Sequence, residues 1–337
     1  MRNTVAIPPD WATWIGENLS LGVAQSRILD ILVDNGFDRR IAAEQLARAG
    51  CNAPPPSVQT VAQQLKNLES LLDVYSDLWS KCRGTGGVDR VSGLRAEVFF
   101  RWYYSVNHPV VLLDRMADWP ALEKWTPDYF KARFGSEQVE VMMGRNSDAA
   151  YEINCERHKT SMRLDRYVDL IETAGETNDF YMVANNRSIE AGNMRRLLDD
   201  IRFTEGFLDP ASAAARLFLW FGPAGTVTPL HYDTMNVLFA QVLGRKKFTL
   251  IPSFQSHLVY NHVGVYSQVD CEAPDYDQFP LFRKVTRLEV VLEPGELLFI
   301  PVGWWHHVRS LDVSMSVSFT NFLTHNSYAW HTPGYRE

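Results

Sequence analysis

The segment TPLHYDTMNVLFAQVLGRKKFTLIPS, residues 228–253, places a histidine and an aspartate two positions apart, ahead of an apolar run and three consecutive basic residues. In a β-strand, residues i and i+2 project from the same face, so His231 and Asp233 are predicted to present an imidazole and a carboxylate together. The His-x-Asp pattern is weak by itself, because a core histidine followed by a solvated aspartate has the same sequence. A metal site here needs a further ligand from elsewhere in the chain.

The segment EPGELLFIPVGWWHHV, residues 293–308, is the candidate source of that ligand. It predicts a turn, an apolar strand and a second turn directly before His306. Together, His306, His231 and Asp233 would offer two imidazoles and one carboxylate to a metal. On one face of a metal this set leaves open positions, as Fe(II) and O2 chemistry requires, whereas zinc hydrolases usually add one water to three ligands. His307 is the rival third ligand.

The basic cluster after the apolar run suggests a second component of the site. Fe(II) with one aspartate carries a net positive charge, and a dicarboxylate that chelates it would leave its far carboxylate in need of a cation inside the cavity. Lys246 follows a predicted turn at Gly244, and strand parity places its side chain on the same face as Phe248. Thr228 can add a hydroxyl. The alternative for Lys246 is a solvated lysine at a strand edge.

Short strands dominate the chain after residue 215, with Gly and Pro between them at close spacing, which predicts an antiparallel sandwich or barrel. The predicted strands are ARLFLWFG, NVLFAQVLG, KKFTLIP, RLEVVLEPG, ELLFIPVG, HHVRSL and VSMSVSFTNF. Between residues 91 and 215, predicted strands at HPVVLLD, QVEVMMG and DFYMVANN accompany helices at 94–104 and TPDYFKARFG. The fold class is therefore mainly β with helical additions.

Residues 1–90 differ from the rest, because their apolar residues recur at helical spacing. One helix is predicted to end at Asn35-Gly36, Asp38 is expected to cap the next, and a third is expected from Val58 to Lys81. The glycine-rich stretch 83–89 predicts a linker. We therefore expect an N-terminal helical region, 1–90, and a second domain, 91–337. Packing or homodimerisation is the simplest role for the helical region, and substrate recognition is the alternative.

Composition limits the class of protein. The chain has 337 residues, 46% hydrophobic and 22% charged, as in ordinary globular proteins. A net charge of -7 argues against an extended nucleic-acid-binding face. The four cysteines form no CxxC pair, which indicates reduced thiols and a cytoplasmic protein. The N-terminus lacks an apolar signal core and no apolar run reaches about 18 residues, so we expect no membrane span.

From about residue 91 to 322 the chain resembles the Jumonji-C, or cupin-like, family of Fe(II)- and 2-oxoglutarate-dependent oxygenases. The His-x-Asp pair, QVLGRKKFTLIP and PGELLFIPVGWWHHV carry the resemblance jointly. It is closest to the hydroxylase branch, which includes an asparaginyl hydroxylase, and to bacterial cupin-like proteins. The resemblance implies a double-stranded β-helix (cupin, or jelly-roll) core, with His231, Asp233 and His306 as the catalytic iron ligands. His306 is preferred to His307, since the family's ligand directly follows the aromatic pair.

The same motifs imply the residues that bind the cosubstrate. Lys246 and Thr228 would bind the far carboxylate of 2-oxoglutarate, and Tyr181 resembles the hydroxylase tyrosine that touches it. The hydroxylase has an asparagine six residues after its first iron histidine; here that position is Val237, and the nearest asparagine is its neighbour Asn236. The hydroxylase has another asparagine on the last core strand, where this chain has Ser318. Both Asn236 and Ser318 are assigned to the cosubstrate site. The resemblance implies that 2-oxoglutarate and O2 are consumed, with succinate and CO2 released and a substrate hydroxylated.

The sequence does not identify the substrate. We expect a protein or peptide side chain. The alternatives are an oxygenase that acts on a small metabolite, a modified nucleoside or an N-methyl group, and a fold whose site no longer turns over. Arg145, Asn185, Asn186 and Arg309 are expected near a cleft rim, where surface or capping roles are the alternative.

Overall fold

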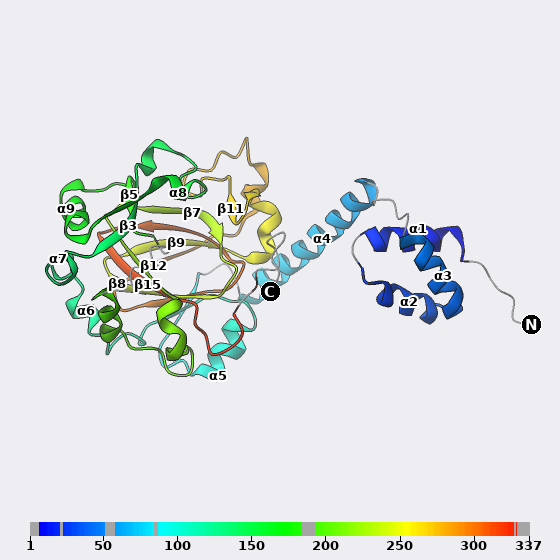
Figure 1. The fold of residues 1–337 in the computed structure, drawn as a ribbon, viewed down its shortest axis with the longest axis horizontal. Coiled ribbons are helices and arrows are strands. Elements are labelled where there is room, and N and C mark those ends of the chain that lie inside the picture. The colour runs from blue at the N-terminus through cyan, green and yellow to red at the C-terminus, as the bar shows by residue number, and fades with distance from the viewer. Residues whose placement is uncertain are drawn as a thin grey trace, which may run out of the picture. The chain divides into compact units, whose positions relative to one another are not determined.

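The computed structural model describes residues 7–20, 23–50, 58–83, 87–183, 193–326 and 328 (Figure 1). The chain divides into two compact units, Met1–Val74 and Tyr75–Glu337. This division falls within helix α4 (Val58–Arg83), whereas the sequence places a boundary at residue 90. The predicted linker at 83–89 lies partly outside the described residues.

The smaller unit contains the helices α1 (Pro9–Ser20), α2 (Gln25–Asp34) and α3 (Arg39–Gly50). Their apolar faces meet in a core of Ile15, Ile28, Leu32, Ala42 and Leu46. The predicted helix ends are confirmed: Gly36 adopts a φ of +89° just after α2, and Asp38 Oδ1 accepts the backbone N–H groups of Arg40 and Ile41. These N–H groups have no partner inside the helix, so the aspartate satisfies them.

The larger unit contains two six-stranded sheets (Figure 1). The first runs β1 (Asp89–Val91), β2 (Val110–Leu112), β13 (Leu297–Ile300), β8 (Val237–Leu243), β15 (Ser314–Phe319) and β6 (Leu217–Gly222). The second runs β10 (Asn261–Val263), β11 (Tyr266–Ser267), β7 (Val227–Tyr232), β14 (Trp305–Ser310), β9 (Lys246–Ile251) and β12 (Leu288–Leu292).

The chain crosses between these sheets at each step from β7 to β8 to β9, and again from β12 through β13 to β14 and β15. The pairs β7–β14, β9–β14 and β8–β13 are all antiparallel. This is the predicted jelly-roll, or double-stranded β-helix. Because the chain alternates between the sheets, strands distant in sequence become neighbours, and β14 lies between β7 and β9.

Strand β8 is buried on both faces, which explains its continuous apolar sequence. Val237 and Phe239 join Phe248 in the core between the two sheets. Leu238 and Ala240, at the alternate positions, join a second core on the other face of the first sheet. Helices α6 (Ala121–Lys124), α7 (Pro127–Phe134) and α9 (Leu164–Ala174) lie on that side of the unit (Figure 1).

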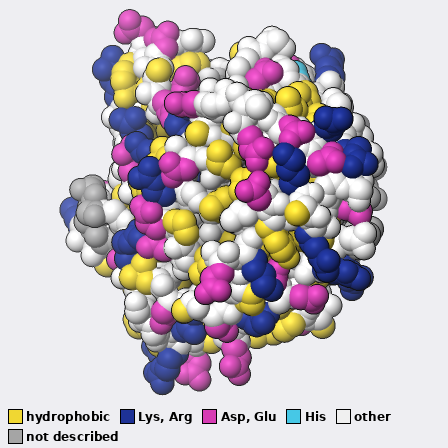
Figure 2. Space-filling view, turned by 90° about the vertical axis from the view of Figure 1, so that its left-hand side faces the viewer, with side chains coloured by type: hydrophobic (Ala, Val, Ile, Leu, Met, Phe, Trp, Pro, Cys, Tyr) yellow, Lys and Arg dark blue, Asp and Glu magenta, His cyan; other side chains and the backbone are white. Residues whose placement is uncertain are grey.

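Upstream of the roll, a third sheet runs β4 (Lys159–Arg163), β3 (Gln138–Met143) and β5 (Phe180–Tyr181). The helix expected at 94–104 is α5 (Ala96–Phe99) followed by one π-helical turn, Phe100–Tyr104. A four-residue helix, α8 (Cys155–His158), precedes β4. No helix in the described part of the chain combines the length and apolarity needed to span a bilayer. On the face shown in Figure 2, acidic and basic side chains are intermingled.

Candidate metal centre and cosubstrate pocket

His231 and His306 meet because strands β7 and β14 are neighbours. The two residues are cross-strand partners, and their ring centroids lie 4.1 Å apart. Asp233 follows β7 directly, and its Oδ2 lies 3.6 Å from His306 Nε2. One ligand atom from each of the three side chains lies within 4.8 Å of the others. Among the described residues, this is the one such group of His, Cys, Asp or Glu.

Backbone carbonyls fix the orientation of both imidazoles. His231 Nδ1 lies 2.8 Å from the Pro229 carbonyl oxygen, and His306 Nδ1 lies 3.0 Å from that of Trp304. A carbonyl only accepts, so each Nδ1 donates its proton and each Nε2 keeps a free lone pair. Burial, with the neighbouring His231, lowers the pKa of His306 to about 4. The ring is therefore neutral at pH 7, as a metal ligand must be.

His307, the rival ligand, lies outside this group. It follows His306 on β14, so its side chain projects from the opposite face of the sheet. Burial lowers the pKa of His307, while the nearby carboxylate of Glu272 acts to raise it. The geometry therefore favours His306, in agreement with the order expected from the motif.

The three side chains border a cavity of about 270 Å³, which Lys246 also lines. Lys246 is 1% exposed, and its Nζ donates a hydrogen bond of 2.8 Å to Tyr181 Oη. Burial lowers the pKa of Lys246 to about 7. No described carboxylate forms an ion pair with Lys246, and the rings of Trp220 and Phe239 lie 5.8 and 5.1 Å from Nζ. A buried ammonium in such surroundings is suited to receive an anion from the cavity.

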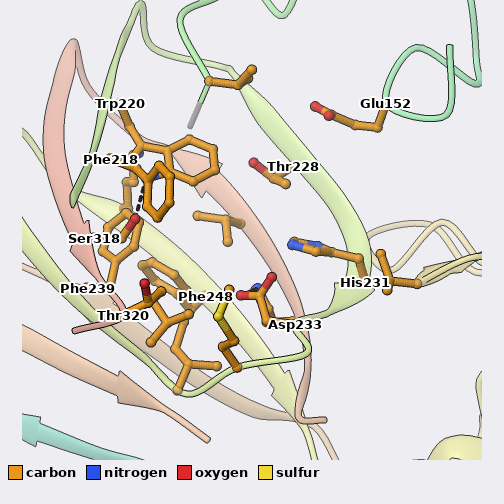
Figure 3. Close-up of a pocket in the computed structure, with 18 of the residues that line it drawn as sticks. Glu152, Phe218, Trp220, Thr228, His231, Asp233, Phe239, Phe248, Ser318 and Thr320 are labelled. Atoms are coloured by element: carbon orange, nitrogen blue, oxygen red, sulfur yellow. Dashed lines mark hydrogen bonds and ion pairs between the residues drawn. The ribbon is translucent and has the colours of Figure 1, made fainter. Parts of the chain in front are cut away.

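Thr228, Tyr181 and Ser318, which the motifs assign to the cosubstrate, line the same cavity. Thr228 projects from β7 toward the interior, on the same strand as His231 (Figure 3). The Ser318 hydroxyl on β15 accepts a 3.0 Å hydrogen bond from Trp220 Nε1 (Figure 3). The wall of the cavity therefore carries the hydroxyl groups of Thr228, Tyr181 and Ser318 together with Lys246. It also carries the three candidate metal ligands.

Asn236 does not line the cavity, contrary to the cosubstrate role expected for it. Its side-chain Nδ2 donates to Asn326 Oδ1 at 3.0 Å, and its Oδ1 accepts the Val302 backbone N–H at 2.9 Å. The amide therefore binds loops on the other side of the strand. Val237, at the position where the hydroxylase has its asparagine, lines the cavity instead. A one-residue offset reverses the face on which a strand residue lies.

No sequence pattern points to Glu152 or Tyr266, yet both line the cavity (Figure 3 labels Glu152). Arg145, expected at a cleft rim, is buried; its Nη2 contacts Glu152 Oε1 at 3.0 Å and the Val227 carbonyl at 2.6 Å. Arg309, also expected there, forms an ion pair with Glu272. Asn185 and Asn186 lie outside the described residues.

Comparison with known proteins identifies the family of this chain. The family model described as "Cupin-like domain" matches residues 95–325. The chain belongs to the cupin-like Jumonji-C family of Fe(II)- and 2-oxoglutarate-dependent oxygenases. The extent of the match coincides with the jelly-roll and the segments that cover it.

Relatives of this Jumonji-C chain carry the names of demethylases. "Lysine-specific demethylase JMJ30" of Arabidopsis thaliana is 35% identical over 79% of this chain and 61% of its own length. "Lysine-specific demethylase 8" of Xenopus tropicalis is 34% identical over 65% and 49%. "Arginine-specific demethylase JMJ20" of Arabidopsis thaliana is 27% identical over 73% and 59%. The chain thus spans about half to three fifths of these relatives.

Fe(II), 2-oxoglutarate and O2 are the cofactors of this Jumonji-C family, and the residues present fit them. Two oriented imidazoles and one carboxylate make the facial donor set of non-haem Fe(II) oxygenases. A dicarboxylate at that metal would place its far end in a cavity that holds the buried Lys246. The charges then balance: iron and Asp233 contribute +1, the dicarboxylate -2 and Lys246 +1.

Proposed function

We propose that this chain is a 2-oxoglutarate-dependent dioxygenase that oxidises a protein or peptide side chain. His231, Asp233 and His306 hold the iron. The single observation that carries the proposal is that this triad and a buried lysine without a described carboxylate partner line one cavity. A structural lysine would gain nothing from such burial, since desolvation of an unpaired ammonium costs several kcal/mol.

Lys246, Thr228 and Tyr181 bind the far carboxylate of the cosubstrate. Lys246 Nζ already donates to Tyr181 Oη at 2.8 Å, so one ammonium proton is used and others remain for the carboxylate. Thr228 and Tyr181 add hydroxyl groups, and Ser318 lies nearby on β15. A charge-assisted hydrogen bond from Lys246, together with hydrogen bonds from the hydroxyl groups, would both strengthen the binding of the cosubstrate carboxylate and fix its orientation.

The residues around the cavity also control water and protons. When bound, the ferrous ion supplies the activation of O2 that is coupled to decarboxylation of the cosubstrate. Phe239, Phe248 and Trp220 form apolar walls that limit water near the reacting groups. The carbonyls of Pro229 and Trp304 accept the Nδ1 protons of the two histidines. Each ring therefore keeps its Nε2 lone pair free to bind the metal.

The outcome on the substrate is proposed to be hydroxylation. Demethylation is the second candidate, favoured by the names of the relatives, which are lysine- and arginine-specific demethylases. The two differ by the carbon attacked: a hydroxylated N-methyl group loses formaldehyde, whereas a hydroxylated side-chain carbon keeps its oxygen. A small metabolite or modified nucleoside remains an alternative substrate.

Two further features stay predictions. Scattered cysteines without CxxC spacing support a cytoplasmic protein; Cys82, Cys155 and Cys271 are free thiols. The helical region 1–90 supports a homodimer, which sedimentation of a dilute sample would test, since a monomer at all concentrations would contradict it.

The test is 2-oxoglutarate turnover with added Fe(II) under air, followed by incubation with cell extract. Succinate formation by the wild type, and none by Asp233→Ala, is the expected result. Mass spectrometry of the extract then separates the outcomes: a gain of oxygen in peptides indicates hydroxylation, loss of methyl groups with formaldehyde indicates demethylation, and changes confined to small molecules contradict the protein substrate. Absence of iron-dependent succinate would refute the oxygenase.

A further inference from the structure

The turn between β13 and β14 contacts two of the metal ligands. It closes with a hydrogen bond of 3.1 Å from the Trp304 N–H to the Pro301 carbonyl. The Trp304 carbonyl accepts the Nδ1 proton of His306 at 3.0 Å. The Gly303 N–H donates to the Asp233 carbonyl, also at 3.0 Å. A shift of this turn would therefore displace both the His306 ring and the main chain that carries Asp233.

Two asparagine side chains hold Val302, in the middle of this turn. Asn107, in the segment before β2, donates from Nδ2 to the Val302 carbonyl at 2.9 Å. Asn236, directly before β8, accepts the Val302 N–H on Oδ1 at 2.9 Å. Side chains from two distant segments thus pair with both backbone polar groups of one residue, which a turn cannot pair through a strand ladder. We call Asn107 and Asn236 the Val302 clamp.

Asn107 is itself fixed by its neighbours. Its Oδ1 accepts hydrogen bonds from Ser253 Oγ at 2.9 Å and from Trp304 Nε1 at 2.8 Å. Its φ of +54° lies in the left-handed region, which asparagine tolerates better than most residues. Because the amide oxygen faces two donors, the amide nitrogen faces the Val302 carbonyl, and the side chain has a single favourable orientation.

Asn236 is fixed by a second asparagine. Its backbone N–H and its Nδ2 both donate to Asn326 Oδ1, at 2.8 and 3.0 Å. Asn326 Nδ2 donates in return to the Asn236 carbonyl and to the Thr320 carbonyl, each at 2.9 Å. Thr320 lines the cosubstrate cavity (Figure 3). Asn236 and Asn326 are buried, so neither amide can turn away without leaving polar groups unpaired, which is costly.

We propose that Asn107 and Asn236 are positioning residues for the metal centre. They hold Val302, and the turn then holds the His306 ring and the main chain of Asp233. This inference deepens the proposed function and rests on it. Neither asparagine lines the cavity, so both act through the turn and not on the cosubstrate. Groups that orient metal ligands contribute roughly 10- to 100-fold to metal affinity.

The experiment measures metal binding without turnover. Co(II), whose visible absorption responds to the geometry of its ligands, is titrated against the full chain in the absence of cosubstrate. Asn107→Gly removes the amide and is compatible with the φ of +54°, so it adds no backbone strain. Asn236→Ala removes the other half of the clamp. Each variant is expected to raise the Kd for Co(II) roughly tenfold or more and to change the spectrum at saturation.

Asn321→Ala is the matched control, because Asn321 is also a buried asparagine whose Nδ2 holds a loop carbonyl, that of Asp209, at 2.7 Å. It should lower the melting temperature but keep the wild-type Kd and spectrum, since a loss of stability alone does not change the ligand geometry.

An unchanged Kd and spectrum in either clamp variant, shown to be folded by thermal melting, would overturn the inference. An equal loss of Co(II) affinity in Asn321→Ala would overturn it as well. Failure of the proposed function would show separately, as a wild type that forms no iron-dependent succinate.

Discussion

His231 and His306 are cross-strand partners whose ring centroids lie 4.1 Å apart, although one belongs to β7 and the other to β14. We predict that His306→Ala lowers Fe(II) affinity by roughly 100-fold or more, since even partners that only orient metal ligands are worth about 10–100-fold. Metal content after dialysis, measured by atomic absorption, is the readout. His307→Ala is the matched control: it removes an adjacent histidine from the opposite face and should retain iron.

Asp233→Ala is expected to abolish succinate formation while the chain stays folded. The Asp233 side chain is 39% exposed and follows the strand, so its removal leaves no core cavity. Circular dichroism melting should show a shift of at most a few degrees, and turnover should fall to background. Full activity in this variant would reject the ligand assignment.

Lys246→Ala is predicted to raise the KM for 2-oxoglutarate far more than the requirement for iron. Loss of a buried charge contact costs about 2 to 4 kcal/mol, which corresponds to roughly 30- to 700-fold. Lys247→Ala is the control, because Lys247 projects from the other face of β9 and pairs with Glu289 at 3.0 Å. Equal effects of the two substitutions would contradict the carboxylate role of Lys246.

Binding of 2-oxoglutarate should weaken as the pH rises above 7. Burial lowers the pKa of Lys246 to about 7, and a bound carboxylate would raise it again, so binding takes up a proton when the free lysine is neutral. The Kd is expected to increase about tenfold from pH 6 to pH 8. Calorimetry in buffers of different ionisation enthalpy should detect proton uptake at pH 8 and little at pH 6. A Kd that falls over this range would contradict the mechanism.

Gly222→Ala is predicted to impair cosubstrate binding through Tyr181. A Cβ at residue 222 would lie 2.6 Å from Tyr181 Cδ2, closer than carbon atoms approach, so the ring or the strand must shift, and Tyr181 Oη is the acceptor of the Lys246 hydrogen bond. Overpacking of this kind costs about 1–3 kcal/mol of unfolding free energy. The KM for 2-oxoglutarate and the melting temperature are the measurements. When Tyr181 is first replaced by leucine, Gly222→Ala should lower the melting temperature by less than it does in the wild type. An undiminished decrease would show that the clash does not involve Tyr181.

Much of the roll could be predicted from sequence because its signals are local. Apolar or alternating runs bounded by Gly and Pro mark β6 to β9 and β12 to β15, and the segment before His306 shows a turn, a strand and a turn, whereas the short strands β10 and β11 had no such signal. Strand parity places Lys246 inside with Phe248, and leaves Lys247 partly exposed. Each of these inferences needs only the neighbouring few residues.

What the sequence did not predict depends on contacts between distant segments. Glu152 lies in a loop without a pattern, and it joins the site because Arg145 and Val227 fix that loop against β7. The sequence places Arg145 at a cleft rim or on the surface, whereas its contacts with the Tyr151 ring and the Val227 carbonyl bury it. The role predicted for Asn236 depended on which of two adjacent residues faces the cavity. Neighbouring residues of a strand lie on opposite faces, and here Val237 lines the cavity.

The alternation of the chain between the two sheets has a consequence for biosynthesis. β7, with Thr228 and His231, leaves the ribosome well before β14, and His306 can pair with His231 only once β14 has been made, after β8, β9, β12 and β13 in the chain. A truncated or half-made polypeptide therefore holds two of three metal-binding groups and an incomplete cage. The complete three-ligand set therefore forms only after β14 has been synthesised and has paired with β7.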